Sequence, residues 1–396
     1  MALSFTIIGM SDAPSPNFSE EILKVISEGR FFSGGKRHHT IVKDLLPQKS
    51  EWVDITVPLG NVYKIYREIN EHIIIFASGD PLFFGFGSTL KRVMPEIPIK
   101  VYPYFNSLQM LSHALVMPYH NMHIVSLTGR PWLELDNVLI ERREKIGVLT
   151  DRDKNPASIA KRLLEYGFNF YRIHVGEHLG NPNKERVTTL SLSEAAERTF
   201  EMPNCLILTR EEVFPARRFG IPEEEFNLLN GRSRMITKMP IRILSLQQME
   251  FHSRRTFWDI GFCTGSISIE ARLMFPHLKI AAFEIREEGA ALMESNSKKF
   301  SAPGIEYRIG DFLLEELGEE SCDAAFIGGH GGRLKEIMER VYSHLTAGGC
   351  IVFNSVTKES KECFLSAANG LNMKINEPVH VELGSNNPID ILKAVK

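Results

Sequence analysis

The 396-residue sequence predicts an α/β protein composed of two domains. Three observations support this prediction. Short β-rich runs alternate with helical patterns up to about residue 210, the alternation breaks once between residues 210 and 240, and it then resumes more regularly. Because strands that alternate with helices are joined by crossover connections, we expect largely parallel sheets.

The first part of the chain carries several short apolar runs separated by amphipathic segments. Its predicted strands are Ser4–Ile8, His72–Ala77, Ile99–Tyr102, His123–Ser126, Ile146–Thr150, Phe170–Val175 and Cys205–Thr209. Its predicted helices include Ser19–Ser27, Ser107–Leu115 and Pro156–Tyr166. The pair His38-His39 lies outside these elements, and we expect it in a solvated surface turn rather than in a metal site, since no partner stands at ligand spacing.

The segment from Arg210 to Pro240 interrupts the alternation. It contains Pro215 and Pro222, an acidic run at residues 223–225 and a basic cluster at residues 232–238. Such proline-rich and charge-rich stretches are typical of domain boundaries. We therefore place the boundary within residues 212–220 and expect domains at residues 1–212 and 213–396.

The second part alternates more cleanly and predicts a doubly wound sheet. Its predicted strands are Thr256–Ile260, Lys279–Phe283, Ile305–Ile309, Ala324–Ile327 and Cys350–Phe353. Its predicted helices are Ser266–Phe275, Glu287–Phe300 and Arg333–Leu345.

Composition excludes several classes of protein. Lys and Arg number 46 against 49 Asp and Glu, so the net charge of -3 offers no field for nucleic acid or an anionic membrane. The five cysteines are scattered and form no C-x-x-C pair, which argues against disulfides and structural zinc and for a reducing compartment. No apolar run is long enough to span a bilayer, and the amino terminus lacks the basic region of a signal peptide. We expect a cytoplasmic protein without a bound metal.

A glycine-rich turn joins the first strand of the second part to the following helix. Acidic residues end the next two strands, where they could meet ribose hydroxyls and an adenine amino group. The candidate cofactor-binding residues here are Asp259, Gly261, Phe262, Cys263, Thr264, Gly265, Glu284, Gly310 and Asp311. A dinucleotide site requires a glycine where Cys263 stands, so a nicotinamide enzyme is the weaker hypothesis. A turn that only connects strand and helix is the purely structural alternative.

A second glycine-rich loop, residues 328–332, follows another strand of the same sheet. Ligands of open α/β sheets bind outside the carboxyl ends of the strands. We expect this loop to form a wall for a flat substrate or for the cofactor, and take Gly328, Gly329 and His330 as substrate-binding candidates. By itself His330 is more typical of an ordinary exposed side chain.

The first part contains a strand that runs into Gly79-Asp80-Pro81. A lone Gly-Asp-Pro is usually an ordinary turn. Here, however, Gly9 ends the first strand, and glycine-containing segments at residues 127–130 and 175–180 follow two other strands. Arg130 in the first of these could pair with a substrate carboxylate through its fork of donors.

These motifs resemble two methyltransferase families. Residues 3–210 resemble the tetrapyrrole methyltransferases, most closely the C5-methyltransferases of cobalamin synthesis. The Asp-x-Gly-x-x-Thr-Gly pattern resembles motif I of Rossmann-type methyltransferases that use S-adenosylmethionine (SAM). Together with residues 219–226, 235–238 and 327–329, this second part resembles the decarboxylating C15-methyltransferases of the same pathway.

The order of the two halves is similar to that of the bifunctional C5,15-methyltransferases that act on a precorrin. The resemblance implies two SAM sites, methylation at C5 and C15, and decarboxylation of the ring C acetate. It assigns one SAM to Thr237 and the glycine turn, and the other to Gly9, Gly79, Asp80 and Pro81. Transfer of the SAM methyl group to an electron-rich carbon needs positioning more than a protein nucleophile, so no catalytic residue is assigned.

Other hypotheses stay open at this point. One domain could be active and the other a scaffold, or the chain could be a SAM enzyme acting outside corrin synthesis. A SAM-binding regulatory module with a protein partner is also compatible with the motifs. The sequence leaves open the oligomeric state, a homo-oligomer included, and whether the substrate carries cobalt.

Overall fold

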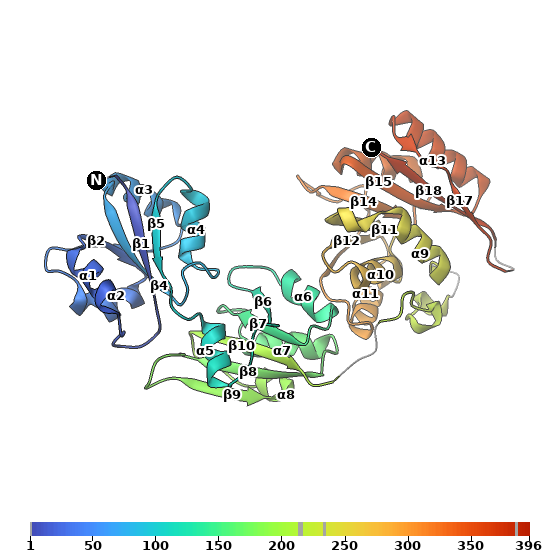
Figure 1. Cartoon of the computed structure of the whole chain (residues 1–396). Helices are drawn as coiled ribbons and strands as arrows, with labels where there is room; N and C mark the ends of the chain where they lie inside the picture. Colours follow the sequence, from blue (N-terminus) through green and yellow to red (C-terminus); the bar gives the residue numbers. More distant parts are fainter. Residues whose placement is uncertain (1, 213–216, 233–234, 385–386) are drawn as a thin grey trace. The chain divides into compact units, whose positions relative to one another are not determined.

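The computed structural model describes residues 2–212, 217–232, 235–384 and 387–396 (Figure 1). It divides into two compact units. The N-terminal unit comprises residues 1–130, 143–161 and 170–211, and the C-terminal unit comprises residues 131–142, 162–169 and 212–396. The predicted boundary region, residues 212–220, includes residues 213–216, which lie outside the described residues.

The first sheet of the N-terminal unit is entirely parallel, in the order β3-β2-β4-β1-β5. The central strand β4 is buried on both faces: Ile73 and Ile75 pack into one core, and Ile74 and Phe76 pack into another. The strands are β1 (Ser4–Met10), β2 (Phe31–Gly34), β3 (Glu51–Asp54), β4 (His72–Ser78) and β5 (Ile99–Tyr102). The helices are α1 (Glu20–Glu28), α2 (Lys36–Val42), α3 (Gly60–Ile69) and α4 (Phe86–Val93).

The second sheet has the order β6-β7-β10-β8-β9, and only β6 and β7 pair in parallel. The prediction of largely parallel sheets is wrong here. The connection from β8 to β9 is too short for a crossover, so these strands form an antiparallel pair. The strands are β6 (His123–Ser126), β7 (Lys145–Leu149), β8 (Tyr171–Glu177), β9 (Arg186–Leu190) and β10 (Asn204–Arg210). The helices in this stretch of sequence are α5 (Ser107–Ala114), α6 (Leu133–Ile140), α7 (Pro156–Glu165) and α8 (Leu192–Ala196).

The sheet of the C-terminal unit has the order β13-β12-β11-β14-β15-β18-β16, with β17 beside β18. The five strands β11 to β15 are parallel, whereas β18 runs antiparallel to β15, β16 and β17. Side chains alternate between two cores, so Trp258 and Ile260 pack on one face and Phe257 on the other. The predicted doubly wound α/β sheet is confirmed.

The remaining elements complete this sheet and its two helical layers. The strands are β11 (Thr256–Ile260), β12 (Lys279–Glu284), β13 (Ile305–Ile309), β14 (Cys322–Ile327), β15 (Leu345–Ser355), β16 (Lys374–Ile375), β17 (Val379–Val381) and β18 (Ile389–Val395). The helices are α9 (Met239–Gln248), α10 (Ser266–Met274), α11 (Glu288–Lys299), α12 (Leu334–His344) and α13 (Lys358–Gly370).

The strand order reverses between β11 and β14. In an open α/β sheet such a switch point leaves a crevice outside the carboxyl ends of the strands, which is the usual ligand site. Within the described residues, no helix is both long and apolar enough to cross a membrane, and no group of three or more His, Cys, Asp or Glu side chains could hold a metal ion.

Candidate functional site

A cavity of about 540 Å³ opens at the switch point of the C-terminal sheet, within the range of roughly 300–1,000 Å³ typical of small-molecule sites. Most of the site residues predicted for this half lie on its wall. These are Thr237, Asp259, Gly261, Phe262, Cys263, Thr264, Gly328 and Gly329. The topology therefore gathers two glycine loops and the segment before α9 around one cavity, which we call the C-terminal cavity.

The two glycine loops touch each other through their backbones. Gly261 has φ +75°, and a Cβ added there would lie 2.5 Å from the Gly329 nitrogen. The Gly328 N–H donates to the Ile260 carbonyl over 2.8 Å, which fixes the second loop against the first. Glycine is required at position 261 for both its conformation and this close approach.

Three buried polar atoms on the wall lack partners among the described residues, and two of them lie on Asp259 and Thr264. Asp259 Oδ2 accepts a hydrogen bond from the Ser268 hydroxyl over 2.6 Å, but Oδ1 has no partner, and neither has the Thr264 hydroxyl. Burial, with a smaller contribution from the nearby Glu284 carboxylate, raises the pKa of Asp259 to about 7, although the hydrogen bonds from Ser268 lower it. Unpartnered buried polar atoms are costly, so these two atoms fit a ligand that carries an ammonium group and further polar atoms.

Glu284 lies behind the glycine turn rather than on the cavity wall. Its side chain is buried, with Oε2 accepting from the Cys263 N–H at 2.8 Å and Oε1 from the Arg286 N–H at 3.1 Å. The Arg286 guanidinium also contacts Oε1 at 3.3 Å. Each carboxylate oxygen accepts about two hydrogen bonds, so the three observed contacts leave about one acceptor site, on Oε2, for ribose. The role that the structure itself displays is to hold the turn.

Three other predicted cofactor residues do not line the cavity. Gly265 has φ +75° and stands at the start of α10, where it packs against Met293. Gly310 donates its N–H to the Glu284 carbonyl over 2.9 Å. The Arg333 guanidinium lies 2.9 Å from the Asp311 carboxylate and holds its pKa below the usual range. An adenine contact from Asp311 would therefore compete with an ion pair.

His330 also lies off the wall of this cavity. Its Nδ1 accepts from the Gly332 N–H at 3.2 Å, and its ring packs edge-on against Phe353 with the centroids 5.7 Å apart. Burial lowers the pKa of His330. The loop forms a wall through its glycines, whereas the histidine turns back on the loop.

Asn354 and Arg286 line the C-terminal cavity but were not predicted. Asn354 stands at the carboxyl end of β15, and its amide lies 3.0 Å from the Ser245 hydroxyl of α9. Its Nδ2 is buried without a partner in the described part of the chain. The position of Asn354 in the sequence could have revealed it, since ligand-binding side chains occur at the ends of strands beside the switch point.

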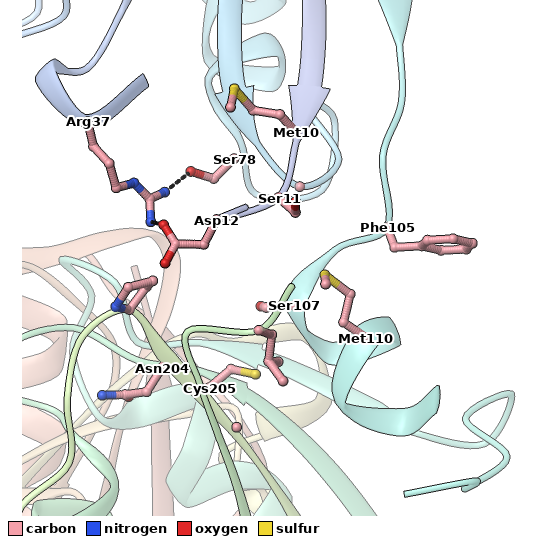
Figure 2. Close-up of a pocket in the computed structure, with 14 residues that line it drawn as sticks. Met10, Ser11, Asp12, Arg37, Ser78, Phe105, Ser107, Met110, Asn204 and Cys205 are labelled. Carbon is pink, nitrogen blue, oxygen red and sulfur yellow. Dashed lines mark hydrogen bonds and ion pairs between the residues drawn. The ribbon is translucent and has the colours of Figure 1, made fainter. Parts of the chain in front are cut away.

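In the N-terminal unit, a small cavity of about 160 Å³ lies next to a larger one of about 430 Å³. They share Ser78, Gly79, Ser107 and Asn204, so their ligands could meet at these residues. Figure 2 shows the small cavity, where the Arg37 side chain reaches Asp12 and Ser78. The same wall includes Gly176 of β8 and Cys205 of β10, so it combines elements of both sheets of this unit.

The Gly-Asp-Pro turn lies at these cavities. Gly79 has φ +60° and lines both of them, and Asp80 lines the large one. Gly9 and Pro81 lie behind the wall. A Cβ at Gly9 would overlap the Gly79 carbonyl and lie 3.1 Å from the Pro81 ring. Glycine at position 9 therefore allows the turn to pack on the end of β1.

The prediction that His38 and His39 lie in a solvated turn is wrong, because both belong to helix α2. His38 lines the large cavity and lies 3.0 Å from the Ser78 hydroxyl, and burial together with Arg37 lowers its pKa to about 4. The His39 ring stacks on Trp52 at 4.3 Å. The basic neighbours of this pair suggested exposure, but its position on a short amphipathic helix brings it against the sheet.

Arg130 is exposed beside the large cavity. Its guanidinium lies 4.9 Å from the centroid of Phe84, which lines that cavity. The predicted substrate-binding residue is thus at the rim rather than in the wall.

Each half of the chain is similar to a known family of methyltransferases. Residues 19–196 match the family of tetrapyrrole (corrin/porphyrin) methylases, and residues 230–384 match the precorrin methyltransferase domain. A cobalt-precorrin-6B C(15)-methyltransferase (decarboxylating) of Salmonella typhimurium is 30% identical over 161 residues, 41% of this chain and 83% of that protein. A cobalt-precorrin-7 C(5)-methyltransferase of the same organism is 26% identical over 204 residues, 51% of this chain and 98% of that protein.

The similarity to known proteins also extends over both halves in a single alignment. The precorrin-6Y C(5,15)-methyltransferase [decarboxylating] of a Sinorhizobium species is 30% identical over 365 residues, which cover 91% of this chain and 86% of that protein. The chain therefore belongs to the family of decarboxylating precorrin-6Y C(5,15)-methyltransferases.

Proposed function

We propose that this SAM-dependent methyltransferase of cobalamin biosynthesis methylates C5 and C15 of a precorrin-6Y-type substrate and decarboxylates its ring C acetate. The C-terminal unit would carry out C15 methylation and decarboxylation, and the N-terminal unit C5 methylation. The observation that supports this division best is the presence of a separate glycine-lined cavity in each unit.

The C-terminal cavity fits SAM by its donor set. Asp259 Oδ1 would accept from the ammonium group, the Thr264 hydroxyl and Thr237 would meet further polar atoms, and Gly261 admits the ligand close to the backbone. Glu284 would act from behind by holding the Cys263 N–H and by offering the remaining acceptor site of Oε2 to ribose. When bound, SAM supplies a methyl group activated by a positively charged sulfur.

In the N-terminal unit, Gly79 and Asp80 would form part of the second SAM site. Gly9 and Pro81 would support that turn without contacting the ligand. The large cavity is lined by Phe76, Phe83 and Phe84, which suits a flat macrocycle.

The chain's own groups are suited to orienting reactants. Transfer of a methyl group to an electron-rich ring carbon depends on in-line placement and on excluding water. The abutting loops at Gly261 and Gly328 give one rigid wall for the acceptor, and the buried Asn354 amide gives it one polar anchor. We also propose a cytoplasmic location, since all five cysteines are free.

The proposal is tested with purified full-length chain, precorrin-6Y and SAM carrying a ¹³C-labelled methyl group. We expect two labelled methyl groups in the product, at C5 and C15 by NMR, and release of carbon dioxide. Repeating the assay with cobalt-precorrin-6Y identifies the preferred form of the substrate. Transfer of only one labelled methyl group would indicate that only one of the two units is active. The absence of methylation with both substrates would contradict the proposal.

A further inference from the structure

The loop that follows the Gly-Asp-Pro turn presents an aromatic ring in a strained position. Phe84 has φ +53°, and the residue is 45% exposed on the wall of the large cavity. A bulky side chain rarely adopts this left-handed conformation. Packing in the core does not explain the left-handed conformation of Phe84, since nearly half of the residue's surface is exposed.

The surrounding loop fixes the ring at this place. A Cβ at Gly85 would lie 2.6 Å from the Pro81 carbonyl, and one at Gly87 would lie 2.8 Å from it. The Ser88 N–H donates to the same carbonyl over 3.3 Å, and the Ser88 hydroxyl donates to the Leu82 carbonyl over 2.6 Å. The chain therefore folds tightly back on Pro81 and presents Phe84 at the outside of the bend.

Arg130 places a positive charge on this ring. Its guanidinium carbon lies 4.9 Å from the ring centroid, within the range of a cation–π contact. In the described part of the chain Arg130 forms no ion pair, whereas Arg37 in the neighbouring cavity is paired with Asp12. Asp80, the acidic residue of the same loop, directs Oδ1 at the Leu82 N–H over 2.8 Å. The guanidinium is thus available to an external anion.

An aromatic face and an uncompensated guanidinium at one rim match a particular class of ligand, a flat conjugated ring with peripheral carboxylates. We propose that Phe84 and Arg130 together recognise the precorrin in C5 methylation: the Phe84 ring packs on the macrocycle and Arg130 binds one of its carboxylates. This inference rests on the proposed function and adds to it two residues that select the substrate.

The test measures inhibition of C5 methylation in the full chain by two stable corrin probes. Cobyrinic acid carries free carboxylates, and its heptamethyl ester has the same ring without the charges. We expect Arg130→Gln to raise the inhibition constant of the acid about tenfold and to leave that of the ester within about twofold. The matched control Arg92→Gln removes an exposed arginine of α4 and should change neither constant.

Phe84→Gly should weaken inhibition by both probes about tenfold, since it removes the ring that both share. It should not lower the unfolding temperature, because glycine adopts φ +53° without strain. Phe84→Tyr keeps the ring and should restore inhibition to within about twofold of the unchanged chain.

Inhibition constants within about twofold of the unchanged chain in both Arg130→Gln and Phe84→Gly would overturn the inference. Loss of inhibition in step with a lower unfolding temperature in Phe84→Gly and Phe84→Tyr would also overturn it, as a purely structural role. Failure of the unchanged chain to methylate C5 is a different result, which would overturn the proposed function and the inference with it.

Discussion

Replacement of Asp259 by Asn should stabilise the protein and weaken its affinity for SAM. The carboxyl group is buried at the C-terminal cavity, and burial raises its pKa from 3.8 to about 7. Asparagine has the same shape and still accepts the Ser268 hydrogen bond, but it carries no charge to desolvate. The substitution therefore separates the cost of burying the charge from the benefit of presenting it to a ligand.

The magnitude follows from linkage between proton binding and folding. The pKa of Asp259 rises by about 3 units on folding, and at about 1.4 kcal/mol per unit this changes the free energy of unfolding by about 4 kcal/mol between low and high pH. Because the folded-state pKa lies above that of the unfolded chain, this contribution to the free energy of unfolding is fully present below about pH 4 and is lost as the pH rises to about 7. We expect Asp259→Asn to be more stable than the unchanged chain by up to about 4 kcal/mol at pH 8, with the difference vanishing towards pH 4.

The same substitution removes the acceptor proposed for the SAM ammonium group. A hydrogen bond between charged groups contributes about 1.5–3 kcal/mol, so the affinity of the C-terminal site should fall about 10- to 150-fold. Urea unfolding from pH 4 to pH 8 measures the first effect, and calorimetric titration with SAM measures the second, with the N-terminal site as internal control. Identical pH profiles in the two proteins, or unchanged affinity at both sites, would refute the reasoning.

Substitutions at three further positions test the architecture of the C-terminal cavity. Cys263 has φ +51°, so Cys263→Gly should be more stable than Cys263→Ala by about 1 kcal/mol in urea unfolding; the opposite order would contradict the strain. Glu284→Gln cannot accept from both the Cys263 and Arg286 N–H groups, so it should lose about 1–3 kcal/mol of stability and show a raised KM for SAM in C15 methylation; unchanged values would remove Glu284 from its role behind the turn. Asn354→Ala removes a buried amide nitrogen without a partner in the described residues, so its stability should stay within about 1 kcal/mol while C15 methylation slows about tenfold; a large loss of stability would instead mark Asn354 as structural.

The sequence predicted the C-terminal sheet well, because its apolar runs are separated by helices with a clear period. The predicted strands Thr256–Ile260 and Ile305–Ile309 have the observed bounds. The antiparallel strands β16, β17 and β18 were not predicted. Strands β16 and β17 are only two and three residues long, whereas β18 has seven residues. Pairing of such strands is decided by neighbours distant in sequence, which periodicity does not report.

The candidate site was predicted where the backbone forms it and less well where side chains complete it. The glycines at positions 261 and 328 indicate that the backbone approaches a ligand closely, and the structure places both at the C-terminal cavity. The orientation of Glu284 behind the turn depends on its contacts with Cys263 and Arg286, which spacing alone does not reveal. Phe84 was not among the predicted site residues, because its unusual φ and its exposure exist only in the folded chain.

The central claim is that one chain holds two separate methyltransferase sites, and a reciprocal pair of variants tests it most directly. A Cβ at Gly261 would meet the Gly329 backbone, and a Cβ at Gly9 would overlap the Gly79 carbonyl. With precorrin-6Y and ¹³C-methyl SAM, Gly261→Ala should lose C15 methylation and carbon dioxide release and keep C5 methylation. Gly9→Ala should lose C5 methylation and keep C15 methylation and carbon dioxide release. Loss of both methylations in either variant, while it remains folded, would contradict the account.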